Sequence, residues 1–283
     1  FGPLALKSLQ SRMIEQGLSR NYINMQIGRI RRMFRWATSE EMIPVSVLHG
    51  LQSVSGLRQG RTEARETDPV LPVDDSDVEA TLRHLPTVVA DMVRFQRLTG
   101  CRPDEVCIVR PCDVDTSADV WIYRPEWHKT EHHGRDRAVP IGPQAQDVLR
   151  RYLLRESTAY CFSPADSELQ RLRDRQAKRT TPLKYGNRAG TNRRRRRKRA
   201  PGAHYTTGSY RRAVHRACNK AFPPPSTLSD VDSKESQREH RWCPNRLRHT
   251  AATDFRKKFG LEAAQVVLGH IHADVTQIYA ERD

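Results

Sequence analysis

The sequence lacks any long run of apolar residues. Hydrophobic residues fill 37% of its 283 positions, and the mean hydropathy is −0.75. A membrane-spanning helix needs about 20 consecutive, mostly apolar residues, and no stretch of the chain approaches that length. Charged residues interrupt positions 1–19, which therefore lack the apolar core of a secretory signal. We expect a soluble protein of the cytoplasm with no membrane partner.

Paired cysteines are also missing. The six cysteines never form a C-x-x-C pair; they are Cys101, Cys107, Cys112, Cys161, Cys218 and Cys243. Their scatter along a long basic chain argues against a disulfide framework. Zinc ligands could be assembled from Cys107 with Cys112, or from His215 with Cys218, but neither pair has a second half at zinc-site spacing. We expect reduced thiols and no metal site.

Acidic residues are few compared with basic ones. Lys and Arg number 49 against 33 Asp and Glu, so the formal net charge is +16. This excess indicates a polyanionic partner such as nucleic acid. No acidic residue lies between Asp174 and Asp230, and this stretch contains an unbroken basic run. The run consists of Arg193, Arg194, Arg195, Arg196, Arg197, Lys198 and Arg199. Such runs are typical of nucleic-acid-binding arms or localisation signals, and we interpret this one as a DNA-binding arm.

The first 57 residues have the pattern of a small helical domain. Apolar residues recur at helical spacing at Ile23, Ile27, Ile30 and Phe34. Ser19 is positioned to cap this helix. Positive charge occupies its other faces, at Arg29, Arg31, Arg32 and Arg35. Alone these arginines would indicate a solvated face, but beside the other basic features they favour a helix that faces DNA. Because the chain opens on Phe1 rather than Met, we expect further residues to precede it.

A linker and a larger domain follow. Residues 58–72 are rich in Gly, Pro and charge, which is the composition of an exposed linker. Residues 73–283 are dominated by helical periodicity, with Gly100 as the stop of one helix. Val120–Tyr123 and the alternating stretch 137–141 predict a hairpin or small sheet that carries Lys129 near its turn. The sequence therefore predicts a mainly α fold with a small β-sheet, of the α+β class.

Three separated segments of the larger domain carry the strongest functional signal. They are LTGCRPDEV at 98–106, NRLRHTAAT at 245–253 and LGHIHADVTQIYAE at 268–281. In this order and in one basic chain, they resemble the motifs of the tyrosine recombinases, the phage integrase family. The resemblance covers residues 73–283, and residues 1–57 are similar to the helical core-binding domain of that family. It implies a site-specific recombinase that cuts and rejoins double-stranded DNA.

The resemblance assigns roles to five residues around the scissile phosphate. It implies that Arg102 and Arg248 bind the nonbridging oxygens, which guanidinium groups meet bidentately. Glu105, one helical turn after Arg102, would orient the site. Lys129 would protonate the departing 5′ oxygen. His270 would donate a hydrogen bond to a nonbridging oxygen.

The same resemblance makes Tyr279 the nucleophile that becomes joined to DNA as a 3′-phosphotyrosine. A phenol has a pKa of about 10, so nearby cations must stabilise the phenolate that develops during attack. The new bond retains the free energy of the broken phosphodiester, so a 5′ hydroxyl of another strand can displace the tyrosine without ATP. Because arginine, lysine and histidine supply the charge that Mg²⁺ supplies in many nucleases, we expect no required metal and no cofactor.

Asn245 departs from the family pattern. The family usually has histidine three residues before its second arginine and assigns it a role in proton handling. An amide can donate a hydrogen bond to phosphate but cannot act as acid or base near pH 7. His249 is adjacent to Arg248, but helical neighbours point about 100° apart, so we interpret His249 as structural. We keep Asn245 in the site as a hydrogen-bond donor.

Four functional hypotheses follow from these patterns. The first is an integrase-type recombinase that exchanges strands in a DNA-bridged tetramer. A type IB topoisomerase-like nicking and closing enzyme would share the phosphotyrosine chemistry, and cleavage paired across two duplexes would separate the two. A catalytically impaired recombinase-fold DNA-binding protein would follow if Asn245 abolished activity, although the other site residues disfavour it. An RNA-binding protein rests on the arginine run alone.

Overall fold

The computed structural model describes residues 1–128, 134, 136–182, 201–225 and 229–269. The chain divides into two compact units, Phe1–Pro69 and Val70–Asp283, here named unit 1 and unit 2. No helix in the described ranges is long and apolar enough to cross a membrane.

Unit 1 consists of three helices around its own apolar core. The helices are α1 (Pro3–Glu15), α2 (Arg20–Ser39) and α3 (Val45–Gln52). The buried core residues are Leu6, Ile23, Ile27, Leu51, Val54 and Ala64. Ile23 and Ile27 belong to the amphipathic helix that the sequence predicts. The Ser19 hydroxyl accepts a hydrogen bond from the amide of Tyr22 at 3.4 Å, which confirms the predicted helix cap.

The segment after α3 also packs on unit 1. Ala64 is buried in the core, and Nε of Arg20 lies 2.6 Å from Oε1 of Glu66. Ser19 and Arg65 form an isolated parallel β-bridge. Residues 64–66, which fall within the expected linker, therefore contact the helices of unit 1.

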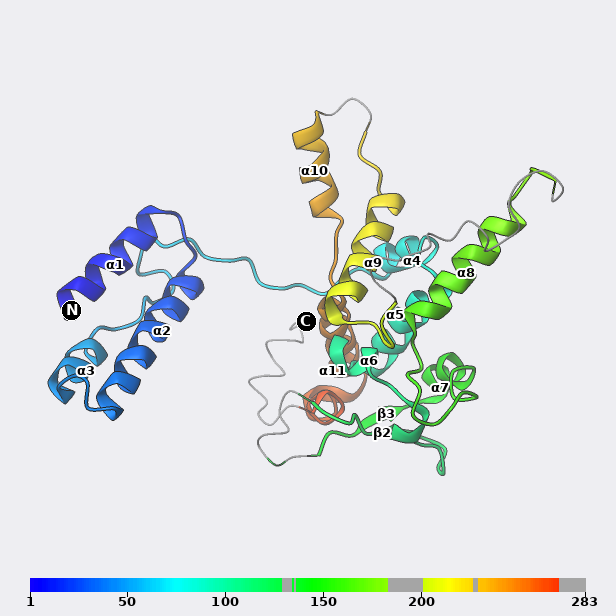
Figure 1. The fold of residues 1–283 in the computed structure, drawn as a ribbon, viewed down its shortest axis with the longest axis horizontal. Coiled ribbons are helices and arrows are strands. Elements are labelled where there is room, and N and C mark those ends of the chain that lie inside the picture. The colour runs from blue at the N-terminus through cyan, green and yellow to red at the C-terminus, as the bar shows by residue number, and fades with distance from the viewer. Residues whose placement is uncertain (129–133, 135, 183–200, 226–228, 270–283) are drawn as a thin grey trace. The chain divides into compact units, whose positions relative to one another are not determined.

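Unit 2 is mostly helical and contains a small antiparallel sheet. Its described helices are α4 (Asp75–Leu82), α5 (Thr87–Thr99), α6 (Pro103–Cys107), the 3-10 helix η1 (Pro111–Asp113), α7 (Pro143–Arg150), α8 (Pro164–Ala177), α9 (Thr207–Ala221), α10 (Asp230–Glu239) and α11 (Pro244–Leu268). The sheet lies at the opposite end of the unit from α10 (Figure 1). This arrangement confirms the predicted mainly α fold with a small sheet.

The described strands follow the order β1 (Val114–Asp115), β2 (Trp121–Tyr123) and β3 (Val139–Ile141) across the sheet. β2 and β3 are the predicted pair, with Trp121 opposite Ile141 and Tyr123 opposite Val139. All four of these side chains are buried. β1 was not predicted, because two residues are too few to show an alternating pattern. The connection between β2 and β3 contains Lys129, which lies outside the described residues.

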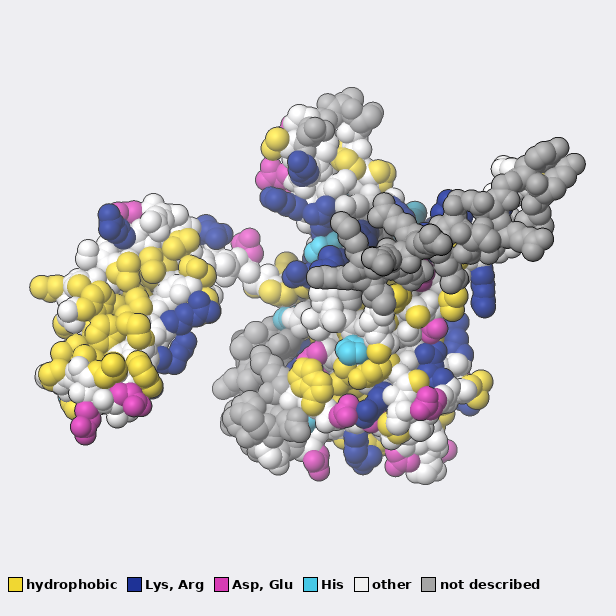
Figure 2. All heavy atoms as spheres, in the orientation of Figure 1, with side chains coloured by type: hydrophobic (Ala, Val, Ile, Leu, Met, Phe, Trp, Pro, Cys, Tyr) yellow, Lys and Arg dark blue, Asp and Glu magenta, His cyan; other side chains and the backbone are white. Residues whose placement is uncertain are grey.

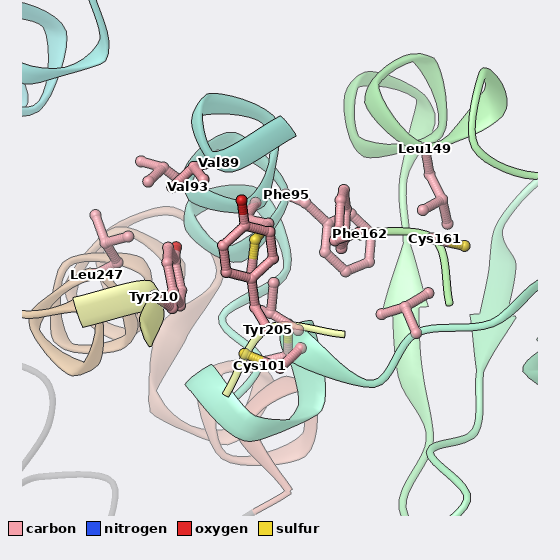
Figure 3. Close-up of a cluster of buried hydrophobic side chains, with 14 of the residues drawn as sticks. Val89, Val93, Phe95, Cys101, Leu149, Cys161, Phe162, Tyr205, Tyr210 and Leu247 are labelled. Carbon is pink, nitrogen blue, oxygen red and sulfur yellow. The ribbon is translucent and has the colours of Figure 1, made fainter. Parts of the chain in front are cut away.

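Helix α5 is the centre of the core of unit 2. It packs against α7, α9 and α11, and its side chains Val89, Val93 and Phe95 are fully buried. Figure 3 shows these three with Tyr210 of α9 and Leu247 of α11. Each large apolar side chain buried in this way contributes roughly 1.5–3 kcal/mol. Core packing therefore fixes the position of α5 and of the residues that directly follow it.

Gly100 ends α5 and lets α11 approach it. Its φ of 64° lies in the left-handed region, which only glycine adopts at little cost. A Cβ at this position would lie 3.1 Å from Leu268, 3.3 Å from Phe255 and 3.4 Å from Ala251, all on α11. The predicted helix stop is confirmed, and the same glycine brings the first sequence motif against α11.

Candidate active site

Arg102 stands at the N-terminus of α6, two residues after Gly100. Its backbone amide donates to Oε2 of Glu105 at 2.7 Å, and its Nη1 donates to Oε1 of the same carboxylate at 2.8 Å. Pro103 occupies the first position of the helix, where the missing N–H removes no helical hydrogen bond. The Arg102 side chain is 18% exposed. It is therefore oriented by Glu105 and still reachable from solvent.

Arg248 joins the ends of two helices. Its Nη1 donates to the carbonyl of Gly100 and its Nη2 to the carbonyl of Leu268, each at 2.7 Å. These carbonyls lie at the C-terminal ends of α5 and α11, where the helix dipole favours a cation. Arg248 is almost fully buried. Gly100 belongs to the first motif and Leu268 to the third, so Arg248 brings all three motifs together.

Glu105 is a buried carboxylate shared by two arginines. Its Oε1 accepts from Nη1 of Arg102 at 2.8 Å and from Nε of Arg137 at 3.2 Å. Burial alone would raise the pKa of this carboxyl. The positive charges of Arg137, Arg248 and Arg102, in decreasing order, together outweigh burial and lower the pKa. The carboxylate is therefore charged at neutral pH and serves as the common counterion of the site.

Arg137 was not among the predicted site residues. Besides its ion pair with Glu105, its Nη1 donates to the carbonyl of Val267, near the end of α11, at 3.1 Å. The residue is 6% exposed. One signal was present in the sequence, because Arg137 shares its side of the alternating stretch with Val139 and Ile141. A charged residue in register with apolar ones needs a buried partner.

Asn245 lies in the first turn of α11, one helical turn before Arg248. Its side chain is half-buried and has no hydrogen-bond partner within the described part of the chain. His249, which we interpreted as structural, is buried on the same helix. Helical spacing therefore places Asn245 on the same side of α11 as Arg248.

Several predicted residues lie outside the described residues. They are Lys129, His270, Tyr279 and the basic run 193–199. Gly269, the last described residue, ends α11 with a φ of 65°. Of the predicted site, the structure therefore describes Arg102, Glu105, Asn245 and Arg248.

The four α2 arginines predicted to face DNA differ in their surroundings. Arg29, Arg32 and Arg35 are exposed, whereas Arg31 is half-buried. Nη2 of Arg31 donates to the carbonyl of Val54, so Arg31 ties α2 to the chain after α3. Figure 2 shows Lys and Arg side chains gathered along one border of unit 1, beside an apolar area. The three exposed arginines are accessible to a phosphate backbone.

The thiol of Cys101, which precedes Arg102 in the sequence, is unreactive at neutral pH. Burial raises the pKa of Cys101 to about 12, and the nearby charge of Glu105 acts in the same direction. A thiol with this pKa stays protonated at neutral pH and does not act as a nucleophile. All six cysteines are free. Within the described residues, no three His, Cys, Asp or Glu side chains form a group suited to a metal ion.

The chain resembles known proteins along almost its whole length. The chain is 24% identical over 288 residues to the tyrosine recombinase XerC of Yersinia pestis. The match covers 98% of this chain and 74% of the XerC chain. A lambda integrase dimer bound to a COC′ core site has a similar fold, with a TM-score of 0.62 at 15% identity. That match covers 99% of this chain and 65% of the lambda integrase chain.

A second solved relative and a family model complete the comparison. The Tn1549 transposon integrase in complex with circular intermediate DNA matches with a TM-score of 0.61 at 18% identity, covering 99% of this chain and 81% of that one. The model of the phage integrase family matches residues 74–283, which contain all three motifs. The protein therefore belongs to the phage integrase family of tyrosine recombinases, enzymes that carry out site-specific recombination by cleaving and rejoining DNA.

Proposed function

We propose that this chain is an integrase-type recombinase that cuts and rejoins double-stranded DNA through a 3′-phosphotyrosyl bond to Tyr279. One observation carries the proposal: Arg248 bonds the backbone of Gly100 and of Leu268, so the three motifs meet around one guanidinium group. A shared phosphate site accounts for this meeting of segments that are distant in sequence.

Two guanidinium groups support binding of the scissile phosphate. Attack on a phosphodiester passes through a phosphorane-like state with added negative charge on the nonbridging oxygens, and preorganised cations stabilise that charge. Arg102 is oriented by the buried carboxylate of Glu105, and Arg248 is held by two carbonyls. We assign both arginines to the nonbridging oxygens and Glu105 to their support.

The remaining residues of the site handle the nucleophile and the protons. The phenol oxygen of Tyr279 forms a bond to phosphorus as the bond to the 5′ oxygen breaks, and Lys129 gives that oxygen a proton. His270 donates a hydrogen bond to a nonbridging oxygen. A 5′ hydroxyl from another strand reverses the step, so no ATP is consumed.

Because side chains fill all of these roles and no metal ion is needed, cleavage should persist in EDTA.

Asn245 takes the role of a neutral donor. Its half-buried amide near Arg248 has no partner within the described residues, which supports a hydrogen bond to phosphate. The amide cannot accept the phenol proton of Tyr279, so that proton passes to water or to another group. This difference predicts a slower enzyme rather than an inactive one.

The two units divide binding and chemistry. We assign residues 1–57 to a DNA-binding domain, residues 58–72 to the connection and residues 73–283 to the catalytic domain. The exposed arginines 29, 32 and 35 of α2 and the run 193–199 would contact phosphates, which agrees with a net charge of +16. Arg31 would contribute through the fold of unit 1. With DNA as its partner, the protein would act in the cytoplasm.

Strand exchange would take place in an assembly of four chains. A lambda integrase tetramer bound to a Holliday junction has a fold similar to this chain, with a TM-score of 0.61 at 15% identity. We propose that this chain likewise forms a DNA-bridged tetramer during recombination.

The test uses two labelled duplexes taken from DNA that flanks the gene. Products that join strands of both duplexes support a recombinase. Relaxation of supercoiled DNA without such products would instead indicate a nicking and closing enzyme of the type IB topoisomerase kind. Binding without any covalent protein–DNA adduct would indicate an impaired DNA-binding protein.

A further inference from the structure

Arg137 lies where three parts of unit 2 meet. It precedes β3 by two residues, pairs with Glu105 of α6, and donates from Nη1 to the carbonyl of Val267 in the last turn of α11. The same Nη1 also donates to the neighbouring carbonyl of Ala138 at 3.2 Å. Its side chain is 4% exposed. One guanidinium group therefore connects the sheet, the helix that begins at Arg102 and the end of α11.

The charge balance of the site depends on Arg137. Among the charges near Glu105, that of Arg137 has the largest effect in lowering the pKa of the carboxyl, ahead of Arg248 and Arg102. Burial acts in the opposite direction and is the largest single influence. Without Arg137, only the charges of Arg248 and Arg102 would oppose the effect of burial on the pKa of Glu105. The Glu105 carboxylate would then take up a proton at a higher pH. A neutral Glu105 would hold the guanidinium of Arg102 less firmly.

Backbone conformation at the end of α11 is adapted to the same side chain. Gly269 has a φ of 65°, and a Cβ on it would lie 2.6 Å from Nη1 of Arg137 and 3.2 Å from its Cζ. Arg137 therefore packs against the glycine that precedes His270. Any larger residue at 269 would displace the guanidinium group from Val267.

We propose that Arg137 is a positioning residue for DNA cleavage. It aligns Arg102 through Glu105, and it fixes the end of α11 from which the chain continues to His270 and Tyr279. This role rests on the proposed recombinase function, and it adds a residue that acts through Glu105 and the end of α11. The Nη2 of Arg137 is buried without a hydrogen-bond partner among the described residues, so the ordering contacts of this group are made by Nε and Nη1.

The test compares Arg137→Met and Arg137→Lys with a matched control, Arg110→Met. Arg110 also forms ion pairs, with Asp113 and Glu126, but has no contact with Glu105 or α11 among those described. Single-turnover cleavage of a nicked suicide substrate is timed from pH 5 to pH 9, and DNA affinity is measured by mobility shift.

Arg137→Met should bind DNA within about twofold of wild type and cleave it on the order of tenfold more slowly. The acidic limb of its plot of cleavage rate against pH should move to higher pH, because Glu105 then takes up a proton more easily. Arg137→Lys should give an intermediate rate, since an ammonium keeps the charge but not the three-way geometry of the guanidinium. Arg110→Met should match wild type in rate and in pH profile.

Gly269→Ala gives an independent check, because it should displace Arg137 and slow cleavage without removing any charge. If Arg137→Met does not fold, the rate and pH profile of Arg137→Lys decide the matter. Wild-type rates and an unmoved pH profile in the folded Arg137 variants would overturn the inference, as would an equal loss in Arg110→Met. If wild type itself forms no adduct, the proposed function fails and the inference with it.

Discussion

At the scale of single residues, one buried carboxylate organises the positive charge of the site. The pair of Arg102 and Glu105 is three residues apart and was predicted from its motif, as was Arg248. The contact between Glu105 and Arg137 spans 32 residues and was missed, because it exists only once the segment that leads into β3 has folded against Glu105. Short-range motif pairs can be predicted from sequence, whereas partners brought together by tertiary packing leave a weaker signal.

Glu105→Gln should lower the free energy of unfolding by about 3 kcal/mol at pH 7, since it leaves buried guanidinium groups without their counterion. The folded-state pKa of Glu105 is lowered from 4.5. Its stabilising effect is therefore present above that value and is lost as pH falls through the lowered pKa. Denaturant unfolding at pH 7 and pH 3 measures both effects. A difference between variant and wild type that grows at low pH would contradict the assignment.

Asn245 offers the sharpest test of a single site position. Asn245→His should speed cleavage, because proton-transfer assistance typically contributes on the order of a hundredfold or more, and the gain will be smaller if Lys129 and water already move the protons. Asn245→Ala should be slower than wild type, because the hydrogen bond is lost. All three proteins are timed on one suicide substrate. Equal rates in the three would remove Asn245 from the site.

At the scale of elements, glycines decide how helices end and meet. Gly100 was predicted as a helix stop because it follows an apolar periodic run, and the structure agrees. Gly260, with a φ of 84° and a ψ of 173°, interrupts α11. That break was not predicted, since apolar residues continue the helical spacing on both sides. Strand β1 was not predicted, because its two residues are too few to show an alternating pattern of apolar and polar side chains.

Gly100→Ala should lower the free energy of unfolding by about 3 kcal/mol, from left-handed strain and from overlap of the new methyl group with α11. Gly17→Ala is the matched control, because Gly17 also has a positive φ, of 70°, but a Cβ there meets nothing within 4 Å. It should lose only about 1 kcal/mol. Chemical denaturation compares the two, and equal losses would show that close packing at Gly100 contributes nothing.

At the scale of the whole molecule, the chain combines an excess of positive charge with a division into two compact units. Composition alone indicated a polyanionic partner, and the family match agrees with that expectation. The extent of unit 1 was less evident from sequence. Residues 64–66 have the composition of a linker, yet Ala64 is buried in its core and Arg20 pairs with Glu66. Composition reports exposure on average and does not reveal such individual contacts.

Neutralising residues 193–199 should weaken binding to unrelated DNA sequences about equally. Fewer counterions would be released, so the plot of log affinity against log salt should become shallower by about 0.9 for each phosphate that the protein no longer neutralises. Titrations at several salt concentrations measure this slope. If it does not change, the run binds no phosphates and the interpretation as a DNA-binding arm is wrong.

Covalent joining of Tyr279 to DNA can be tested by trapping the protein–DNA adduct. Wild type and Tyr279→Phe are incubated with nicked suicide substrates from the DNA that flanks the gene, and adducts are resolved under denaturing conditions. Wild type should form a 3′-phosphotyrosyl adduct that maps to Tyr279. Tyr279→Phe should bind the same DNA with nearly unchanged affinity and form none, because only the attacking oxygen is missing. An adduct of the same polarity in Tyr279→Phe would show that Tyr279 is not the nucleophile.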